Sequence, residues 1–140
     1  MVRTDHIRLQ TRGHADIHNL TPELERLLQA SGQSDGLLTV FTPSSTSAVT
    51  AIEHEPGALE DLRRALDRIA PPNEDYRHNE AWGDGNGHAH LRAALLKPSL
   101  SIPFQAGQLL LGTWQQVVFI DFDVRPRRRS IVVQILGDAS

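Results

Sequence analysis

Alternating polar and apolar residues open the chain. Residues 6–11 have the order His-Ile-Arg-Leu-Gln-Thr, and this period of two predicts a strand with one buried face. We expect a short extended piece around Ile17, and then a helix with Thr21 as N-cap, Pro22 at the first helical position and Gly32 as its end. Leucines at positions 24, 27 and 28 would form the buried face of that helix.

The spacing of apolar residues changes twice in the middle of the chain. Residues 36–42 (GLLTVFT) and 45–54 (STSAVTAIEH) are rich in β-branched side chains, and they predict two neighbouring strands joined by a short turn. Apolar side chains between residues 59 and 69 then keep helical spacing until two prolines interrupt it, which predicts a second helix. A short third helix is expected over residues 90–96.

The last third of the chain is made of extended segments. Its apolar runs at residues 117–120 and 131–133 show no alternation, which is typical of strands covered on both faces. Glycine and proline separate four segments, which favours an antiparallel meander. The predicted fold class is therefore α+β, with one domain over residues 1–140 that holds a largely antiparallel β-sandwich and two or three packed helices. The four segments are residues 99–104, 108–112, 115–123 and 129–137.

Composition narrows the classes of function. A net charge of −3 gives no general reason to expect nucleic acid as a partner. The chain has no cysteine, so thiolate chemistry is excluded and any metal ion must be held by nitrogen and oxygen atoms. No stretch reaches the roughly 18 consecutive apolar residues of a membrane span, and we expect a cytoplasmic protein with no membrane partner.

Residues 76–96 (YRHNEAWGDGNGHAHLRAALL) gather histidines, acids and glycines. His88 and His90 are two positions apart, so they project to the same side of an extended backbone but about 200° apart in a regular helix. If they precede the helix, they form with His78 and Asp84 a candidate ligand set for a divalent ion such as zinc. The alternative is a glycine-rich turn with exposed histidines.

The same loop also fits an anion. Backbone N–H groups of Gly85, Asn86 and Gly87 at a helix start, with Arg92 nearby, would form a cradle for phosphate or carboxylate. The glycine pattern is not a Walker loop, because no Gly-Lys-Ser/Thr follows, and it is not the dinucleotide fingerprint, because no strand directly precedes it. We expect no organic cofactor.

Hydroxyl and acidic side chains bracket residues 42–55. Ser44, Ser45 and Thr46 are candidate ligands for phosphate oxygens, and Glu53 is a candidate metal ligand or general base. An ordinary turn followed by a half-buried strand explains the same residues equally well. No Gly-x-Ser-x-Gly elbow occurs, which disfavours a serine nucleophile.

Two further clusters are candidates for binding. Thr113, Trp114 and Gln115 place an aromatic face beside hydroxyl and amide groups and would floor a ligand pocket, although a core anchor is the simplest interpretation of Trp114. Residues 125–129 (RPRRR) hold four arginines. A solvated hairpin or an intersubunit network of salt bridges is favoured over an anion site, and nucleic acid is disfavoured because no aromatic platform is interleaved.

Four segments, taken together and in this order, resemble the YjbQ family of small proteins. They are STSAVTAIEHEPG, HNEAWGDGNGHAHLRAALLKPSLSIPF, GQLLLGTWQQVVFIDFD and RPRRRSIVVQILG. The resemblance covers nearly the whole chain. It implies a compact α+β fold with a β-sandwich and a homotrimer with polar loops near the subunit boundaries. The resemblance leaves the function unsettled. Some members are linked to weak thiamine-phosphate synthase activity, which joins a hydroxymethylpyrimidine diphosphate to a thiazole phosphate.

Position by position, the resemblance is incomplete. His78 and His90 match histidines of the common family pattern, whereas His88 and the glycine loop match a subgroup. Many relatives have histidine and threonine where this chain has Ser44 and Ser45. If the missing histidine activates substrate or holds metal, the resemblance implies that His88, His54 or Glu53 takes that role here.

Two hypotheses follow from the sequence. The first is an enzyme that acts on a phosphorylated small molecule, with a divalent ion, zinc or magnesium, held by histidine and by Glu53 or Asp84. The candidate catalytic residues are His90, Glu53 and Arg92; Arg92 and the glycine loop would hold the phosphate, and residues 113–115 the organic part. The second is a non-catalytic homotrimer that binds a metal ion or a metabolite.

Overall fold

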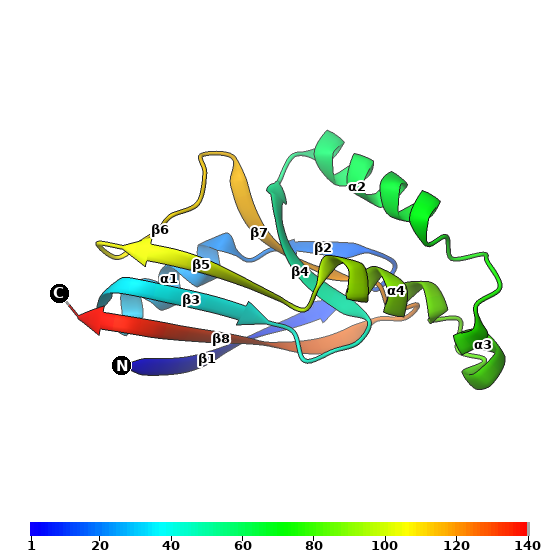
Figure 1. Ribbon diagram of the computed structural model, residues 1–140, viewed down its shortest axis with the longest axis horizontal. Helices are drawn as coiled ribbons and strands as arrows, with labels where there is room; N and C mark the ends of the chain where they lie inside the picture. The colour runs from blue at the N-terminus through cyan, green and yellow to red at the C-terminus, as the bar shows by residue number, and fades with distance from the viewer. Residues whose placement is uncertain (140) are drawn as a thin grey trace.

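The computed structural model describes residues 1–139, which form two antiparallel sheets and four helices (Figure 1). The larger sheet has the strand order β1-β8-β3-β5-β6, and the smaller has the order β2-β7-β4. This architecture confirms the predicted α+β class. The strands are β1 (Val2–Thr11), β2 (Asp16–Asn19), β3 (Gln33–Phe41), β4 (Ser47–Glu53), β5 (Ser99–Gln105), β6 (Gln108–Leu109), β7 (Gln115–Asp121) and β8 (Arg127–Ala139). The helices are α1 (Thr21–Ser31), α2 (Pro56–Ile69), α3 (Arg77–Trp82) and α4 (Gly87–Leu96).

The smaller sheet is the middle layer of the molecule. Val117 and Phe119 of β7 pack with the inner face of the larger sheet and with the leucines of α1. Val118 and Ile120 point to the opposite face and pack with side chains of α2 and α4. Because β7 lies between β2 and β4 and is covered on both faces, all four positions are buried and apolar, as the run predicted.

The predicted pairing of the strands is wrong in two places. β3 and β4 are not neighbours, because the loop between them carries the chain from the larger sheet to the smaller one. The last third is not a meander either, since β7 joins the smaller sheet and β8 pairs with β1 and β3 along most of its length. Within the run at 131–133 only Ile131 and Val133 are buried, and Val132 is partly exposed on the open face of the larger sheet. An apolar run therefore did not reveal which strands pair.

The described residues contain four helices, whereas two or three were predicted. The helix that was not predicted is α3, which lies in the segment after α2 that was expected to be a loop. α1 ends as expected at Gly32, whose φ of 69° is left-handed. Thr21 is not the N-cap but the first helical residue, after Leu20. Its hydroxyl oxygen accepts a hydrogen bond from the buried N–H of Val117 at 2.8 Å, so a tertiary contact replaces the cap.

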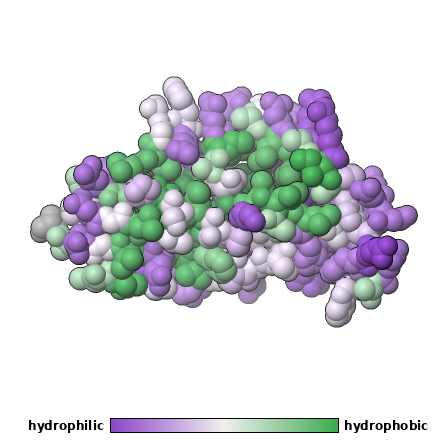
Figure 2. All heavy atoms as spheres, viewed as in Figure 1, coloured by the Kyte–Doolittle hydropathy of each residue, from purple (hydrophilic) through white to green (hydrophobic). Residues whose placement is uncertain are grey.

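The outer face of the larger sheet is exposed. Leu37, Phe41 and Leu136 are 40%, 41% and 52% exposed there, and they alternate with polar side chains along β3 and β8. Figure 2 shows hydrophobic residues gathered over the middle of the face in view, interrupted by paler and a few hydrophilic ones, with most hydrophilic residues toward the edges. The sheet therefore presents a mixed surface rather than a purely polar one.

Candidate functional site

A polar cleft of about 400 Å³ opens where three loops meet. The loop before β4, the start of α4 and the turn between β7 and β8 each contribute side chains to it. We call it the serine–arginine cleft. The structure thus brings the predicted hydroxyl cluster beside part of the predicted histidine loop, and adds acids and arginines from the β7–β8 turn. It is lined by Pro43, Ser44, Ser45, Thr46, Asp84, Asn86, His90, Asp123, Arg127 and Arg129.

Arg129 joins the two sheets beneath the cleft. Its guanidinium donates to both carboxylate oxygens of Asp121 at 2.7 and 2.9 Å, and to Thr46 Oγ1 at 2.9 Å. Asp121 is fully buried and also accepts a hydrogen bond from Thr11 Oγ1 at 2.6 Å. A buried carboxylate requires such partners, because an unpaired charge away from water is strongly destabilising. The network therefore fixes Thr46 and its loop against β8.

Asp123 is a second buried carboxylate, and Arg127 neutralises it. Arg127 Nη2 lies 3.1 Å from Asp123 Oδ2, which also accepts a hydrogen bond from Thr46 Oγ1 at 3.1 Å. Burial alone would raise the pKa of Asp123, but the hydrogen bonds and the charge of Arg127 outweigh it and hold that pKa below its usual value. The Arg127 side chain makes no other ion pair within residues 1–139, and although its Nε is buried, the side chain as a whole is 33% exposed. Arg127 therefore retains donors for an anion.

His90 reaches the cleft from α4, beside His78 of α3. The two ring centroids are 4.3 Å apart, and the ring planes are tilted by 48°. His78 Nδ1 lies 3.4 Å from Asp84 Oδ1 and has no hydrogen-bond partner. Within residues 1–139 no three or more His, Cys, Asp or Glu side chains are grouped so as to hold a metal ion by themselves. Three of the four predicted metal ligands are thus neighbours, without converging on one point.

His88, the fourth, is separated from this group. α4 begins at Gly87, so His88 and His90 lie in a regular helix and point about 200° apart. The prediction that they grip one ion together is wrong, because the helix begins before them rather than after them. His88 is buried, and burial, together with the charge of Arg92, lowers its pKa. It is therefore a neutral imidazole near neutral pH.

Two of the three backbone N–H groups of the predicted cradle, those of Asn86 and Gly87, are already engaged. The N–H of Asn86 donates to Asp84 Oδ1 at 3.1 Å, and the N–H of Gly87 donates to Asn79 Oδ1 at 2.9 Å. Short polar side chains have thus already satisfied these donors. The Asn86 side chain is the better candidate: it is buried, its Oδ1 accepts from the N–H of Val124 at 3.1 Å, and its amide lines the cleft.

Arg92 does not line the cleft. It is 4% exposed, and it donates to Asp67 Oδ1 at 2.9 Å and to the carbonyl oxygen of Ala70 at 3.1 Å. Its guanidinium carbon also lies 5.7 Å from the ring centroid of Phe122. Arg92 therefore ties α4 to the end of α2.

Glu53, Thr113, Trp114 and Gln115 gather at the other end of the smaller sheet. Glu53 ends β4 and pairs in register with Gln115, which begins β7. At about 3.3 Å per residue, the length of these strands puts this end about 20 Å from the cleft. Glu53, Thr113 and Trp114 line a separate hollow of about 450 Å³, and Trp114 is 73% exposed rather than a core anchor.

Sequence reasoning missed four residues of the cleft or its floor: Asp121, Asp123, Arg127 and Arg129. The signal was available in the pattern DFD-VRP-RRR, where acids alternate on one arm of a turn and arginines follow on the other. Alternate residues of a strand share a face, so the acids and two of the arginines could have been placed on one side. The favoured interpretation as a solvated hairpin is wrong for Arg127 and Arg129.

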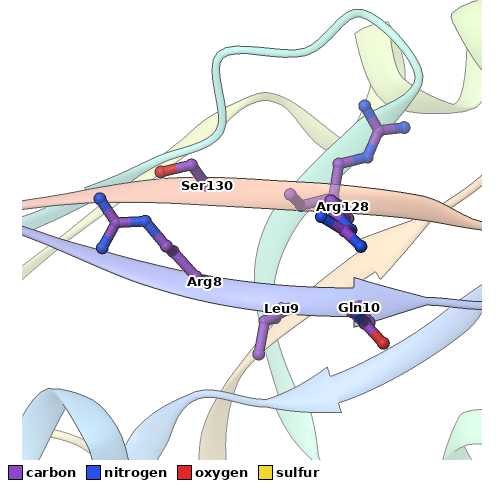
Figure 3. Close-up of a pocket in the computed structure, with 6 residues that line it drawn as sticks. Arg8, Leu9, Gln10, Arg128 and Ser130 are labelled. Carbon is purple, nitrogen blue, oxygen red and sulfur yellow. The ribbon is translucent and has the colours of Figure 1, made fainter.

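Arg128, like Arg125, is exposed to solvent. It lies on β8 opposite Gln10 of β1, and Arg8 lies two residues further along β1, opposite Ser130; all four line a further hollow of about 470 Å³ between the strands (Figure 3). Neither guanidinium has an ion-pair partner within residues 1–139. Arg128 and Arg129 thus differ in environment although they are adjacent in sequence.

Fold and cleft together define a small α+β protein of two packed sheets with a polar cleft where the sheets meet. The family model described as "UPF0047 protein YjbQ-like" matches residues 5–138. A UPF0047 protein of Archaeoglobus fulgidus is 37% identical over 130 residues, which cover 93% of this chain and 98% of that protein. The UPF0047 protein YugU of Bacillus subtilis is 30% identical over 94% of this chain and 97% of its own length. The chain belongs to the YjbQ-like UPF0047 family.

Solved structures agree with this assignment. A YbjQ-like protein of unknown function from Sulfolobus solfataricus superposes with a TM-score of 0.94 and 33% identity, covering 99% of both chains. A conserved hypothetical protein from Thermus thermophilus superposes with a TM-score of 0.77 and 34% identity, covering 93% of this chain and 99% of its own. The family is one of unknown function. In residues 1–139, no helix has the length and apolar character needed to span a membrane.

Proposed function

We propose that this protein is an enzyme that acts on a phosphorylated small molecule bound in the serine–arginine cleft. One observation carries the proposal: the buried carboxylate of the cleft, Asp123, is already paired, while hydrogen-bond donors remain. Ser44 and Ser45 contribute hydroxyl groups, and Arg127 contributes the N–H groups that its ion pair does not use. Donors gathered in a concave site recognise phosphate oxygens, and arginine does so with charge as well as geometry.

His90 is the acid or base of this proposal. It lines the cleft beside the two serines and is only partly buried, so it can reach a bound ligand. Histidine is the side chain whose ordinary pKa allows proton transfer in either direction near neutral pH. His78, whose tilted ring lies beside it, and Asn86, held by the backbone of Val124, are positioning residues.

We place a divalent ion at the edge of the cleft, between His78 and Asp84. His78 Nδ1 and Asp84 Oδ1 are 3.4 Å apart, which is the spacing of two ligands that share one ion at about 2.1 Å each. Two protein ligands leave positions for phosphate oxygens, an arrangement common for ions that bind phosphorylated substrates. Held by His78 and Asp84, magnesium or zinc would supply positive charge to neutralise those oxygens.

Thiamine-phosphate synthase activity is the specific reaction that the family resemblance implies. It fits the proposal in one respect, because both of its substrates are phosphorylated small molecules. Arg92 and Glu53 do not carry it in this cleft: Arg92 is engaged with Asp67, and Glu53 lies at the far end of the smaller sheet. The cleft residues His90 and Arg127 take their places in the proposal.

The test compares a histidine that lines the cleft with one at the opposite end of the smaller sheet. His90→Ala should lower the turnover of small organic phosphates and diphosphates, assayed with magnesium or zinc, by about 10²- to 10⁴-fold, the usual contribution of an acid–base group. His54→Ala is the matched control, because His54 is exposed at the opposite end of the smaller sheet and should leave the rate unchanged. Arg127→Gln should raise KM. Equal rates in the His90 and His54 variants would refute the proposed role of His90.

The bound ion has its own measurement. Elemental analysis of untagged protein should find a divalent ion that is lost in His78→Ala and retained in His54→Ala. If the ion content is the same in both variants, His78 and Asp84 do not form the site.

A second candidate function is a non-catalytic homotrimer that binds a metal ion or a metabolite. The exposed outer face of the larger sheet, with Leu37, Phe41 and Leu136, favours self-association. Analytical ultracentrifugation tests the assembly, and a trimer without turnover of any phosphate in the screen would favour this candidate. Trimeric assembly and a cytoplasmic location stay predictions.

A further inference from the structure

A second hollow, of about 270 Å³, adjoins the serine–arginine cleft. The two share Ser44, Ser45 and His90 among their lining residues. They are therefore two halves of one larger site, with these three side chains at the junction. The serine–arginine cleft by itself already falls in the range of roughly 300–1,000 Å³ that is usual for small-molecule sites, and the second hollow extends it.

The second half is different in chemistry. Away from the junction it is lined by Ser47, Ala93, Ala94 and Pro98. The alanines and the proline offer no side-chain hydrogen bond. The Ser47 hydroxyl is buried and already bonded to Thr42 Oγ1 at 2.8 Å. A ligand group in this half would consequently contact apolar surface, with no charged side chain among the lining residues.

We propose that the site selects phosphate esters of a small apolar or aromatic group. The phosphate lies against Arg127 and the serines, and the organic group lies against Ala93, Ala94 and Pro98. This inference rests on the proposed function and adds the substrate class to it. The bond that joins the phosphate to the organic group then lies at the junction, beside His90, where the acid or base is needed.

Ala94 offers a way to block one half alone. It is exposed on α4, so Ala94→Leu fills the apolar hollow without disturbing the core, and leucine is a good helix former. Ala65→Leu is the matched control, because Ala65 is also exposed in the interior of a helix, α2, and lines neither half. Thermal unfolding of both variants confirms that they fold.

The probes are inorganic phosphate and benzyl phosphate, titrated into the full chain and followed by NMR. Benzyl phosphate should bind at least about tenfold more tightly than phosphate, since its ring and methylene leave water. Ala94→Leu should reduce the affinity for benzyl phosphate to that for phosphate and leave phosphate binding unchanged. Ala65→Leu should change neither.

Different results would refute the substrate class and the proposed function. If both probes bind wild type equally, or if Ala94→Leu weakens both by the same factor, the apolar half is not a substrate site although the anion site stands. If neither probe shifts the resonances of Ser44, Ser45 and Arg127, the proposed function fails, and the substrate class fails with it.

Discussion

Arg129→Met tests the network that supports the cleft. The substitution preserves much of the length of the side chain but removes its charge and all three of its hydrogen bonds, two to Asp121 and one to Thr46. Asp121 is fully buried, so its carboxylate would keep only the hydrogen bonds from Thr11 and from the N–H of Asp123.

The expected loss of stability can be worked out in two ways. Two hydrogen bonds to a charged group contribute at least about 1.5 kcal/mol each, which gives about 3 kcal/mol. Removing one partner of a buried ion pair typically costs about 3–5 kcal/mol, because the other charge is left unpaired. Arg129→Met should therefore lower the free energy of unfolding by about 3–5 kcal/mol, a large part of the stability of a domain of this size.

Urea denaturation at neutral pH and one fixed protein concentration is the assay. Arg128→Met is the control, because Arg128 is adjacent in sequence but exposed and without an ion pair in residues 1–139; it should change the stability by no more than about 0.5 kcal/mol. Similar losses in the two variants would show that the Arg129–Asp121 pair does not hold the sheets together at the cleft.

Three further predictions concern stability. The pKa of Asp123 is lower in the folded state than its ordinary value of 3.8, so the ionised carboxylate stabilises the fold above that value, and this contribution is lost as pH falls through the folded-state pKa. In Asp123→Asn the free energy of unfolding should therefore fall less steeply with acidification than in wild type. Urea denaturation between pH 7 and pH 3 measures the difference. Gly13→Ala should destabilise more than Gly83→Ala in thermal unfolding: both have positive φ, but only at Gly13 would a Cβ lie 2.4 Å from a backbone oxygen. Thr21→Val should cost about 1–3 kcal/mol in urea denaturation, since the buried N–H of Val117 loses its acceptor; a loss below 0.5 kcal/mol would contradict that role.

The sequence patterns predicted individual strands and helices better than they predicted which strands pair. The alternation at residues 6–11 and the unbroken run at 117–120 each report burial of a single strand, and both strands were found. Which strands pair depends on contacts far apart in sequence. β8 pairs with β1 over ten residue positions, and nothing in either segment specifies the other.

The residues of the candidate site were likewise predicted only in part. His90, Ser44 and Ser45 were predicted from residue type and short spacing, and the structure places them together. Arg127 was underestimated, because a guanidinium in a turn has the same sequence pattern whether it faces solvent or a buried carboxylate. His88 was misjudged because one turn of helix decides which way two residues two apart point.

The sequence by itself determined the family, the α+β class and the residue types available for chemistry, because these depend on composition, periodicity and motifs along the chain. Only the tertiary structure decided which of those residues share a site. It placed Glu53 and Trp114 at one end of β4 and β7 and the cleft at the other end, about 20 Å along the strands, and brought Asp121 to Arg129 across the two sheets. The physical reason is that an extended strand carries its two ends far apart, whereas packing two sheets puts distant segments in contact.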